Sequence, residues 1–141
     1  MCRCTRRSAM LVMAASWLGF GSWTKASADP ATEHQEFIAA AIKIKDEAIA
    51  KGDQPYGAVV VSNGRIVGFG PSRVVLKKDV SAHAEREAIR DAQARRGTAD
   101  LAESVLYSTS RPCSACERAA AQARIARMIH GADATDAGRP Q

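Results

Sequence analysis

Four side chains that can bind a metal ion or transfer protons stand in two short motifs. His83 and Glu85 lie two residues apart in "SAHAEREA", and Cys113 and Cys116 lie three residues apart in "RPCSAC". Cysteines at positions i and i+3 of a helix share one face and can bind one ion, and a helix N-terminus favours their thiolate forms. C-x-x-C is also typical of thioredoxin-like proteins. Taken alone, the cysteine pair therefore indicates either a metal site or a thiol redox centre.

The H-x-E motif changes that balance. A histidine at a helix start is commonly a packed or surface group, and a glutamate there is a favourable partner of the helix dipole. Side chains at i and i+2 do not share a helical face, but at a helix end they can still converge by pointing along the axis. H-x-E followed by P-C-x-x-C is the signature of zinc deaminases. The combination favours a metal site.

The sequence resembles the cytidine and deoxycytidylate deaminase-like superfamily, most closely the branch of guanine deaminases and tRNA adenosine deaminases. The resemblance covers residues 33–138 and rests on "GDQPYGAVVV", "DVSAHAEREAI", "LYSTSRPCSAC" and "ARIARMIHGA", in that order. It implies one Zn²⁺ per chain, bound by His83, Cys113 and Cys116, with Glu85 as a catalytic residue that does not bind the metal.

This division of labour agrees with zinc chemistry. Three protein ligands leave the fourth position open for water, which is typical of a catalytic site. Zinc lowers the pKa of that water toward about 7, so hydroxide is available to attack an amidine-type ring carbon. Glu85 would carry the proton to a ring nitrogen and then to the amino group, which leaves as ammonia. The resemblance favours a free purine or its nucleoside, such as guanine or adenosine, over cytosine or cytidine.

Further substrate contacts are implied by the resemblance. Tyr56, Gly57 and Ala58 match the family stretch that lines the base pocket, and the backbone of Ala84 lies between a zinc ligand and the catalytic residue. The run "YGAVVV" must also form a buried strand, which makes Tyr56 and the backbone near Gly57 the better candidates for contact.

Two positions depart from the family pattern. Ser72 stands where this branch has an asparagine that binds substrate, and one hydroxyl cannot supply the paired donor and acceptor of an amide. Arg111 stands where the family has a glutamate before P-C, so it is a candidate contact for an anionic group of the substrate or an exposed turn residue. Both belong to the predicted substrate-binding set.

Periodicity and turn signals predict the elements that position these motifs. Apolar residues at helical spacing predict a helix over 33–51, with Gly52 ending it. Two β-rich runs, about 56–62 and 65–70, flank Asn63-Gly64, a pair typical of a two-residue hairpin turn. The polar stretch that follows, around 77–79, is expected to be a loop.

The second half of the chain is predicted to alternate helices and strands. Ser81 can cap a helix that ends near Arg96, and Pro112 suits the first position of a helix that ends near Ala123. Short strands are expected at 104–107 and 127–130, with no element after them. These elements predict an α/β domain with a mixed sheet of about four strands, built from a hairpin and β-α-β-type crossovers. The resemblance implies that this domain has the three-layer α/β/α cytidine-deaminase-like fold.

The first 28 residues have the features of a cleavable export signal. A basic start, "MCRCTRR", precedes an apolar stretch at 9–23 and an A-x-A site, and cleavage is expected after Ala28. Thr5, Arg6 and Arg7 resemble the start of a twin-arginine signal. The stretch is shorter than the roughly 20 apolar residues that span a bilayer. The protein is therefore expected in the periplasm or otherwise exported, without stable membrane association after cleavage.

Composition bounds the partners of the remaining domain, residues 29–141. These residues contain 16 basic and 15 acidic side chains, a formal charge of +1, because four of the 20 basic residues lie in the first 28. Nucleic-acid binding normally needs clustered basic side chains, so no nucleic-acid partner is expected. A homodimer is expected to cover apolar surface. The alternatives to an enzyme are an inactive zinc-binding protein of the same fold and a periplasmic thiol-disulfide protein that uses Cys113 and Cys116.

Overall fold

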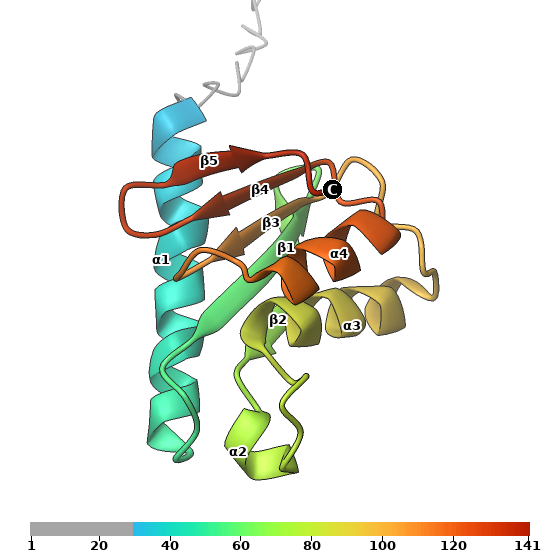
Figure 1. Cartoon of the computed structure of the whole chain (residues 1–141). Coiled ribbons are helices and arrows are strands. Elements are labelled where there is room, and N and C mark those ends of the chain that lie inside the picture. Colours follow the sequence, from blue (N-terminus) through green and yellow to red (C-terminus); the bar gives the residue numbers. More distant parts are fainter. Residues whose placement is uncertain (1–29) are drawn as a thin grey trace, which may run out of the picture.

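Helices and strands alternate along the chain in the computed structural model, which describes residues 30–141 (Figure 1). The predicted export signal lies outside the described residues. Between residues 30 and 141, no helix has the length and apolarity needed to cross a membrane. The elements are α1 (Pro30–Ala50), β1 (Gly57–Ser62), β2 (Arg65–Pro71), α2 (Val74–Lys77), α3 (Ala84–Arg96), β3 (Val105–Ser108), α4 (Ser114–Gln122), β4 (Arg127–His130) and β5 (Thr135–Gly138).

The sheet contains five strands in the order β2-β1-β3-β4-β5. β1 and β2 form the predicted antiparallel hairpin, and Asn63 and Gly64 at its turn have φ angles of 51° and 68°, as a two-residue turn requires. β1 also pairs antiparallel with β3. β2 therefore runs in the same direction as β3, and α3 connects them across β1.

α4 connects β3 to β4, which pair in parallel with Ser108 opposite His130. Since β2 and β3 run in the same direction, the helices that follow them start at the same edge of the sheet. The N-termini of α3 and α4 therefore meet at the carboxyl ends of these strands, which is where the two sequence motifs lie.

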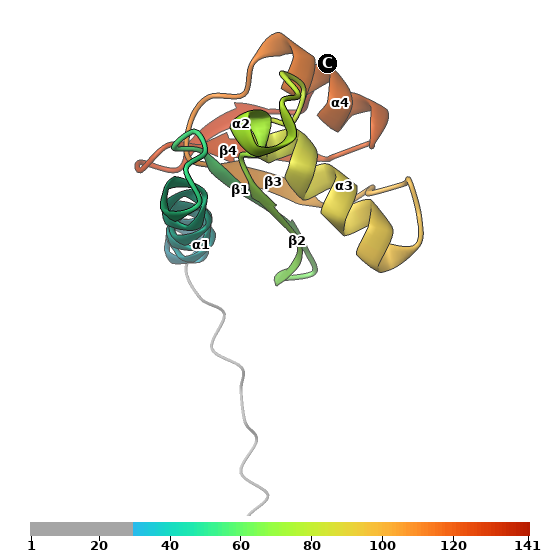
Figure 2. The same ribbon diagram turned by 90° about the horizontal axis from the view of Figure 1, so that it is seen from below.

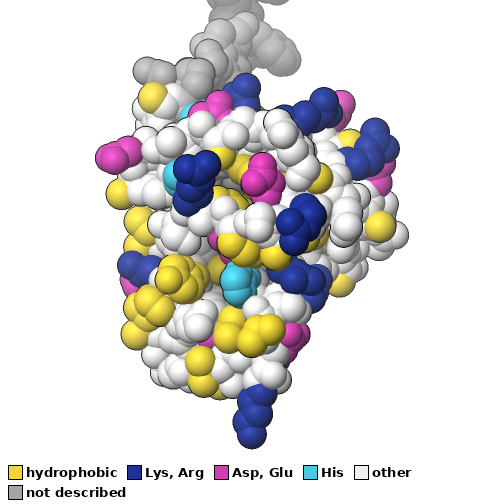
Figure 3. All heavy atoms as spheres, in the orientation of Figure 1, with side chains coloured by type: hydrophobic (Ala, Val, Ile, Leu, Met, Phe, Trp, Pro, Cys, Tyr) yellow, Lys and Arg dark blue, Asp and Glu magenta, His cyan; other side chains and the backbone are white. Residues whose placement is uncertain are grey.

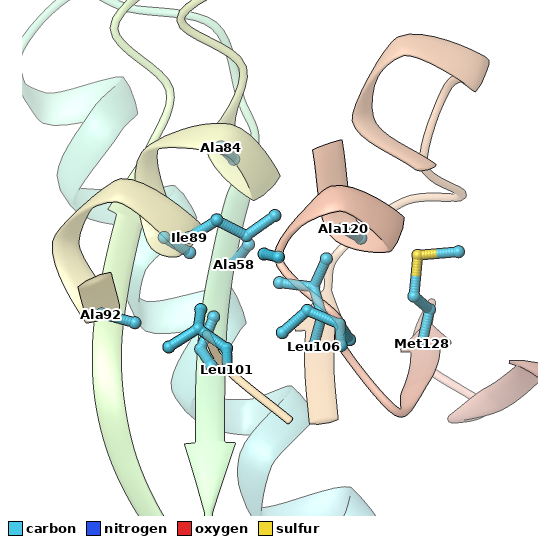
Figure 4. Close-up of a cluster of buried hydrophobic side chains, with 12 residues drawn as sticks. Ala58, Ala84, Ile89, Ala92, Leu101, Leu106, Ala120 and Met128 are labelled. Carbon is cyan, nitrogen blue, oxygen red and sulfur yellow. The ribbon is translucent and has the colours of Figure 1, made fainter. Parts of the chain in front are cut away.

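Two hydrophobic cores cover the two faces of the sheet. α1 packs on one face, and α3 and α4 pack on the other, as Figure 2 shows. β1 contributes to both, because Ala58 and Val60 face α3 and α4 while Val59 and Val61 face α1. The core between α3, α4 and the sheet consists largely of alanine, leucine and isoleucine side chains (Figure 4). The predicted three-layer α/β/α architecture is confirmed.

α3 lies unusually close to β2 because the strand has glycines at the contact. A Cβ atom on Gly70 would overlap the carbonyl oxygen of Ala84 and the amide nitrogen of Ala88 and would lie 2.7 Å from the Ala88 Cβ. A Cβ atom on Gly68 would lie 2.5 Å from the Ala88 carbonyl oxygen. Only glycine permits this approach, and it sets the position of the first turn of α3.

The sequence-based prediction was wrong about the end of the chain and about the stretch after β2. Thr135–Gly138 forms a fifth strand, β5, antiparallel to β4, where no element was expected. Val74–Lys77 forms a short helix, α2, that was not predicted.

The starts of α3 and α4 also differ from the prediction. His83 is the N-cap of α3, and the Ser81 amide instead donates a hydrogen bond of 2.7 Å to Asp79 Oδ1 in the preceding turn. Cys113 is the N-cap of α4, which places Pro112 just before the helix and not at its first position. Each helix thus begins at a predicted zinc ligand.

Replacing Gly70 by alanine tests whether the close approach of α3 holds the site in place. We expect Gly70→Ala to lower the free energy of unfolding by about 1–3 kcal/mol through overpacking and to weaken zinc binding, because the first turn of α3 must shift. Urea denaturation and zinc titration measure the two effects.

Gly131→Ala is the matched control. Gly131 has a φ of 76°, and a Cβ atom added there would have no other atom within 4 Å. Alanine at this position therefore costs about 1–2 kcal/mol of backbone strain without moving α3. Zinc affinity that is equal in the two variants would contradict the positioning argument.

Candidate active site

The four residues of the two motifs converge where α3 and α4 begin. His83 and Cys113 are the N-caps, and neither caps its helix with a side-chain hydrogen bond, so both side chains are free for other contacts. Glu85 and Cys116 lie in the first turns behind them. The convergence that the sequence predicted for a metal site is present, although the motifs are about 30 residues apart.

The distances between the three predicted ligand atoms fit a tetrahedral zinc ion. His83 Nδ1 is 3.7 Å from Cys113 Sγ and 3.4 Å from Cys116 Sγ, and the two sulfur atoms are 3.5 Å apart. Bonds of the usual Zn–S and Zn–N lengths at tetrahedral angles would place sulfur atoms about 3.8 Å apart and nitrogen about 3.6 Å from sulfur. The sulfur atoms are too far apart for a disulfide bond. His83, Cys113 and Cys116 form the cluster of three possible metal ligands found within residues 30–141.

The electrostatics of the site also fit a bound cation. Burial raises the pKa of Glu85, whose side chain is only 5% exposed and whose Oε2 lies 3.5 Å from Cys116 Sγ. Burial, followed by the neighbouring Glu85 carboxylate, raises the pKa of the Cys116 thiol. A bound Zn²⁺ would reverse this tendency for the thiol, since a coordinating thiol is deprotonated outright. The donor set therefore fits zinc held by two thiolates and one imidazole.

Burial is uneven across the ligands. Cys116 is fully buried, His83 is half-buried and Cys113 is exposed, so the site is closed on the core side and open on the other. A pocket of about 400 Å³ lies at the open side, within the usual size range of about 300–1,000 Å³ for small-molecule sites. Its lining consists of Gln54, Tyr56, His83, Ala84, Glu85, Ser110, Arg111 and Cys113.

The predicted substrate contacts fall into two groups. Tyr56, Ala84 and Arg111 line the pocket. Gly57 and Ala58 are buried in β1 and are not among the lining residues. Gly57 is a packing position, because a Cβ atom there would overlap the backbone of α1.

Ser72 also lies outside the lining. Its side chain is fully buried, and its hydroxyl donates a hydrogen bond of 2.8 Å to Asp53 Oδ1. Its assignment as a substrate contact stays a prediction.

Asp53 is a positioning residue that the sequence did not reveal. One carboxylate oxygen accepts hydrogen bonds from the Gln54 amide and the Ser72 hydroxyl, and the other accepts from the amides of Val75 and Leu76 in α2. Burial acts to raise the pKa of Asp53, but these hydrogen bonds outweigh it and lower the pKa below its ordinary value of 3.8. Asp53 thus ties the loop that carries Gln54 and Tyr56 to α2. The partners are distant in sequence, so no local signal marks them.

Comparison with known proteins agrees with this geometry. Residues 31–132 match the family described as the cytidine and deoxycytidylate deaminase zinc-binding region. The chain belongs to this deaminase family. Family membership together with the His/Cys/Cys group supports one Zn²⁺ per chain.

Two curated relatives match over most of the domain. The chain is 35% identical over 105 residues to a guanine deaminase of Bacillus subtilis, covering 74% of this chain and 67% of the relative. It is 34% identical over 100 residues to a tRNA-specific adenosine deaminase of Streptococcus pyogenes, covering 71% of this chain and 63% of the relative. The matched region thus spans about two thirds of the length of these relatives. The resemblance to this branch, predicted from the sequence, is confirmed.

Solved structures support the same fold. The crystal structure of guanine deaminase from Bacillus subtilis matches with a TM-score of 0.67 at 34% identity, over 70% of this chain and 64% of that one. A structure from a study of tRNA:A34 deaminases matches with a TM-score of 0.66 at 35% identity, over 68% and 70%. The cytidine-deaminase-like fold expected from the sequence is confirmed, with five strands instead of about four.

Zinc content tests the ligand set. We expect purified residues 29–141 to contain one zinc ion per chain and to expose two free thiols once a chelator removes it. Cys116→Ala should lose the metal, whereas Ser114→Ala, an exposed position between the two cysteines, should keep it. Elemental analysis and thiol titration are the measurements. A zinc-free protein with Cys113 and Cys116 joined in a disulfide would support redox chemistry instead.

The Asp53 network predicts a specific pH dependence of stability. Asp53→Asn should lower the free energy of unfolding by about 1–3 kcal/mol at pH 7, because the carboxylate accepts on both oxygens, whereas an asparagine amide is uncharged and accepts on only one. A depressed pKa in the folded state stabilises the protein above the unfolded pKa, and this contribution is lost as pH falls through the folded pKa. The difference from wild type should thus be constant between pH 7 and 5 and shrink only below about pH 4. Urea denaturation at each pH measures it, and a difference that changes between pH 7 and 5 would contradict this assignment.

Proposed function

We propose that this chain is a zinc-dependent hydrolytic deaminase of a free nucleobase or nucleoside, with purines such as guanine or adenosine favoured over cytosine or cytidine. The observation that carries the proposal is the position of Glu85. Its buried carboxylate lies beside the Cys116 sulfur and lines the same pocket as His83 and Cys113. A proton carrier next to a metal-binding group at the base of an open pocket is the arrangement that hydrolysis of a cyclic amidine needs.

The chain's own residues supply binding and proton transfer. His83, Cys113 and Cys116 would hold zinc, which when bound supplies a Lewis acid that makes water reactive near neutral pH. Glu85 takes a proton from the attacking water and delivers it to the ring nitrogen beside the amino-bearing carbon. It then carries the second proton to the amino group as the carbon–nitrogen bond breaks. Water and the amino compound are thereby converted into a ring carbonyl and ammonia.

The charge of the domain supports a small substrate over tRNA. Residues 29–141 carry a formal charge of +1. On the face in Figure 3, basic and acidic side chains are interspersed, and they do not gather into one basic surface. RNA binding relies on clustered basic groups against phosphates. The name of one relative, tRNA-specific adenosine deaminase, keeps tRNA as the second candidate, and assays with free purines and with tRNA distinguish the two.

Location and assembly complete the proposal. Export to the periplasm, predicted from residues 1–28, would separate the protein from tRNA, and the N-terminal residue of the mature protein tests it.

Assembly as a homodimer is supported by apolar side chains that are exposed in and after α2: Val75 at 53%, Leu76 at 54% and Val80 at 84%. The mass of the protein in solution tests the dimer.

Glu85→Ala distinguishes an enzyme from an inactive zinc-binding protein. We expect the variant to keep its zinc and to lose about 10²–10⁴-fold in kcat, because the proton carrier is gone while all three ligands remain. Ammonia release from a panel of purines and pyrimidines, with zinc content in parallel, is the measurement. Glu36→Gln, an exposed position on α1, is the control and should keep full activity. Loss of zinc from Glu85→Ala would contradict its assignment as a residue that does not bind the metal.

A further inference from the structure

Gln54 brings an unpaired side-chain amide to the pocket. Its backbone is held on both sides, because its N–H donates a 2.7 Å hydrogen bond to Asp53 Oδ1 and its carbonyl accepts a 2.8 Å hydrogen bond from the Tyr56 N–H. The side chain is half-buried, lines the pocket and has no hydrogen-bond partner among residues 30–141. A fixed backbone limits the positions that the amide can reach. The amide is therefore held at the pocket without a protein group to satisfy it.

The other lining residues cannot provide the same recognition. His83, Cys113 and Glu85 are occupied by metal binding and proton transfer, and Ala84 has no polar side chain. The remaining polar side chains are two hydroxyls and the Arg111 guanidinium, which only donates. Within the lining, Gln54 alone places a donor and an acceptor side by side on one planar group. Ser72, the position predicted from the sequence, turns its hydroxyl to Asp53 instead.

We propose that Gln54 is a specificity-determining residue that pairs with a lactam edge of the substrate, a ring N–H next to a ring C=O. This inference rests on the proposed function. The amide oxygen of Gln54 accepts from the ring N–H, and its NH₂ group donates to the ring carbonyl. An edge that offers only an acceptor, as N1 and C6–H of 2-aminopurine do, leaves the amide oxygen without a donor. In adenosine, each ring edge that pairs a donor with an acceptor uses the amino group that deamination removes. The substrate class that fits is an aminopurine with a lactam, as in guanine, and adenosine lacks this edge.

Guanine and 2-aminopurine isolate the lactam. Both carry the amino group on C2 between two ring nitrogens, but 2-aminopurine lacks the C6 oxygen and the N1 hydrogen. We expect the zinc-loaded protein to favour guanine over 2-aminopurine by about 100-fold in kcat/KM, since a site built to hydrogen-bond a group rejects an analogue that lacks it. Gln54→Leu should lower kcat/KM for guanine about 10- to 100-fold and change the value for 2-aminopurine about threefold or less.

Two further variants sharpen the test. Gln54→Glu keeps an acceptor and loses the donor, so it should also lose the preference for guanine. Gln122→Leu makes the same replacement as Gln54→Leu at an exposed position at the end of α4, outside the pocket lining, and should retain the wild-type preference. A preference that survives Gln54→Leu unchanged would overturn the proposal while leaving deamination itself intact.

Equilibrium binding separates this inference from the proposed function. In a zinc-loaded Glu85→Ala background, turnover is blocked, and calorimetry should show that Gln54→Leu weakens guanine about 10-fold and leaves 2-aminopurine unchanged. Failure of the wild type to release ammonia from any compound in the panel would overturn the proposed function, and this binding difference would still support Gln54. Equal affinity for guanine and 2-aminopurine in the Gln54-containing protein would overturn the assignment of Gln54, whatever the activity.

Discussion

Two helix N-termini that meet at one edge of the sheet are the constraint on which the site depends. They bring two thiols and a buried carboxylate within a few ångströms of one another, with Cys116 Sγ 3.5 Å from both Cys113 Sγ and Glu85 Oε2. Without a cation, burial and mutual repulsion disfavour the charged forms of Glu85 and Cys116 and raise the pKa of both groups. The positive ends of the helix dipoles favour these charged forms in part, and a bound zinc ion would favour them further. A zinc ion bound at this edge would thus balance charge that the meeting of the two helices brings together.

The meeting of the helices depends in turn on very small residues. Gly68 and Gly70 on β2 face the backbone of α3 with no room for a side chain. Ala84 and Ala88 on the helix are almost fully buried at this contact. Such an interface buries little apolar area, so it contributes less to stability than larger side chains would. Its effect is positional, because it fixes the distance of α3 from the sheet and hence the place of His83.

Local patterns predicted most of the fold and the zinc ligands. The two elements that they missed, α2 and β5, are both held by contacts with other parts of the chain. The Asn63-Gly64 turn and the helical spacing of α1 and α3 are encoded within short windows, so they could be found without a structure. β5 has the sequence TDAG, which has no strand periodicity, and it forms only because β4 offers an edge to pair with. α2 is held by Asp53, about 20 residues earlier in the chain.

The site shows the same difference between features that local sequence encodes and features that depend on contacts between distant parts of the chain. H-x-E and P-C-x-x-C are local patterns, whereas the pocket position of Gln54 depends on three stretches that are distant in the chain and meet around the pocket. The starts of α3 and α4 were misplaced by a similar effect. Ser81 suits a cap and Pro112 suits a first helical position, but the caps are His83 and Cys113, whose side chains contact each other across the two helices.

The separation of the ligands along the chain gives zinc a second consequence. His83 and Cys116 are 33 residues apart, and α3 and β3 lie between them. A metal ion that joins them is a cross-link that closes a long loop, as a disulfide would, but one that forms and breaks with the supply of metal. By mass action, the folded population then rises with the free zinc concentration around the protein. Proteolysis that acts on the unfolded chain would therefore slow as the zinc level around the protein rises.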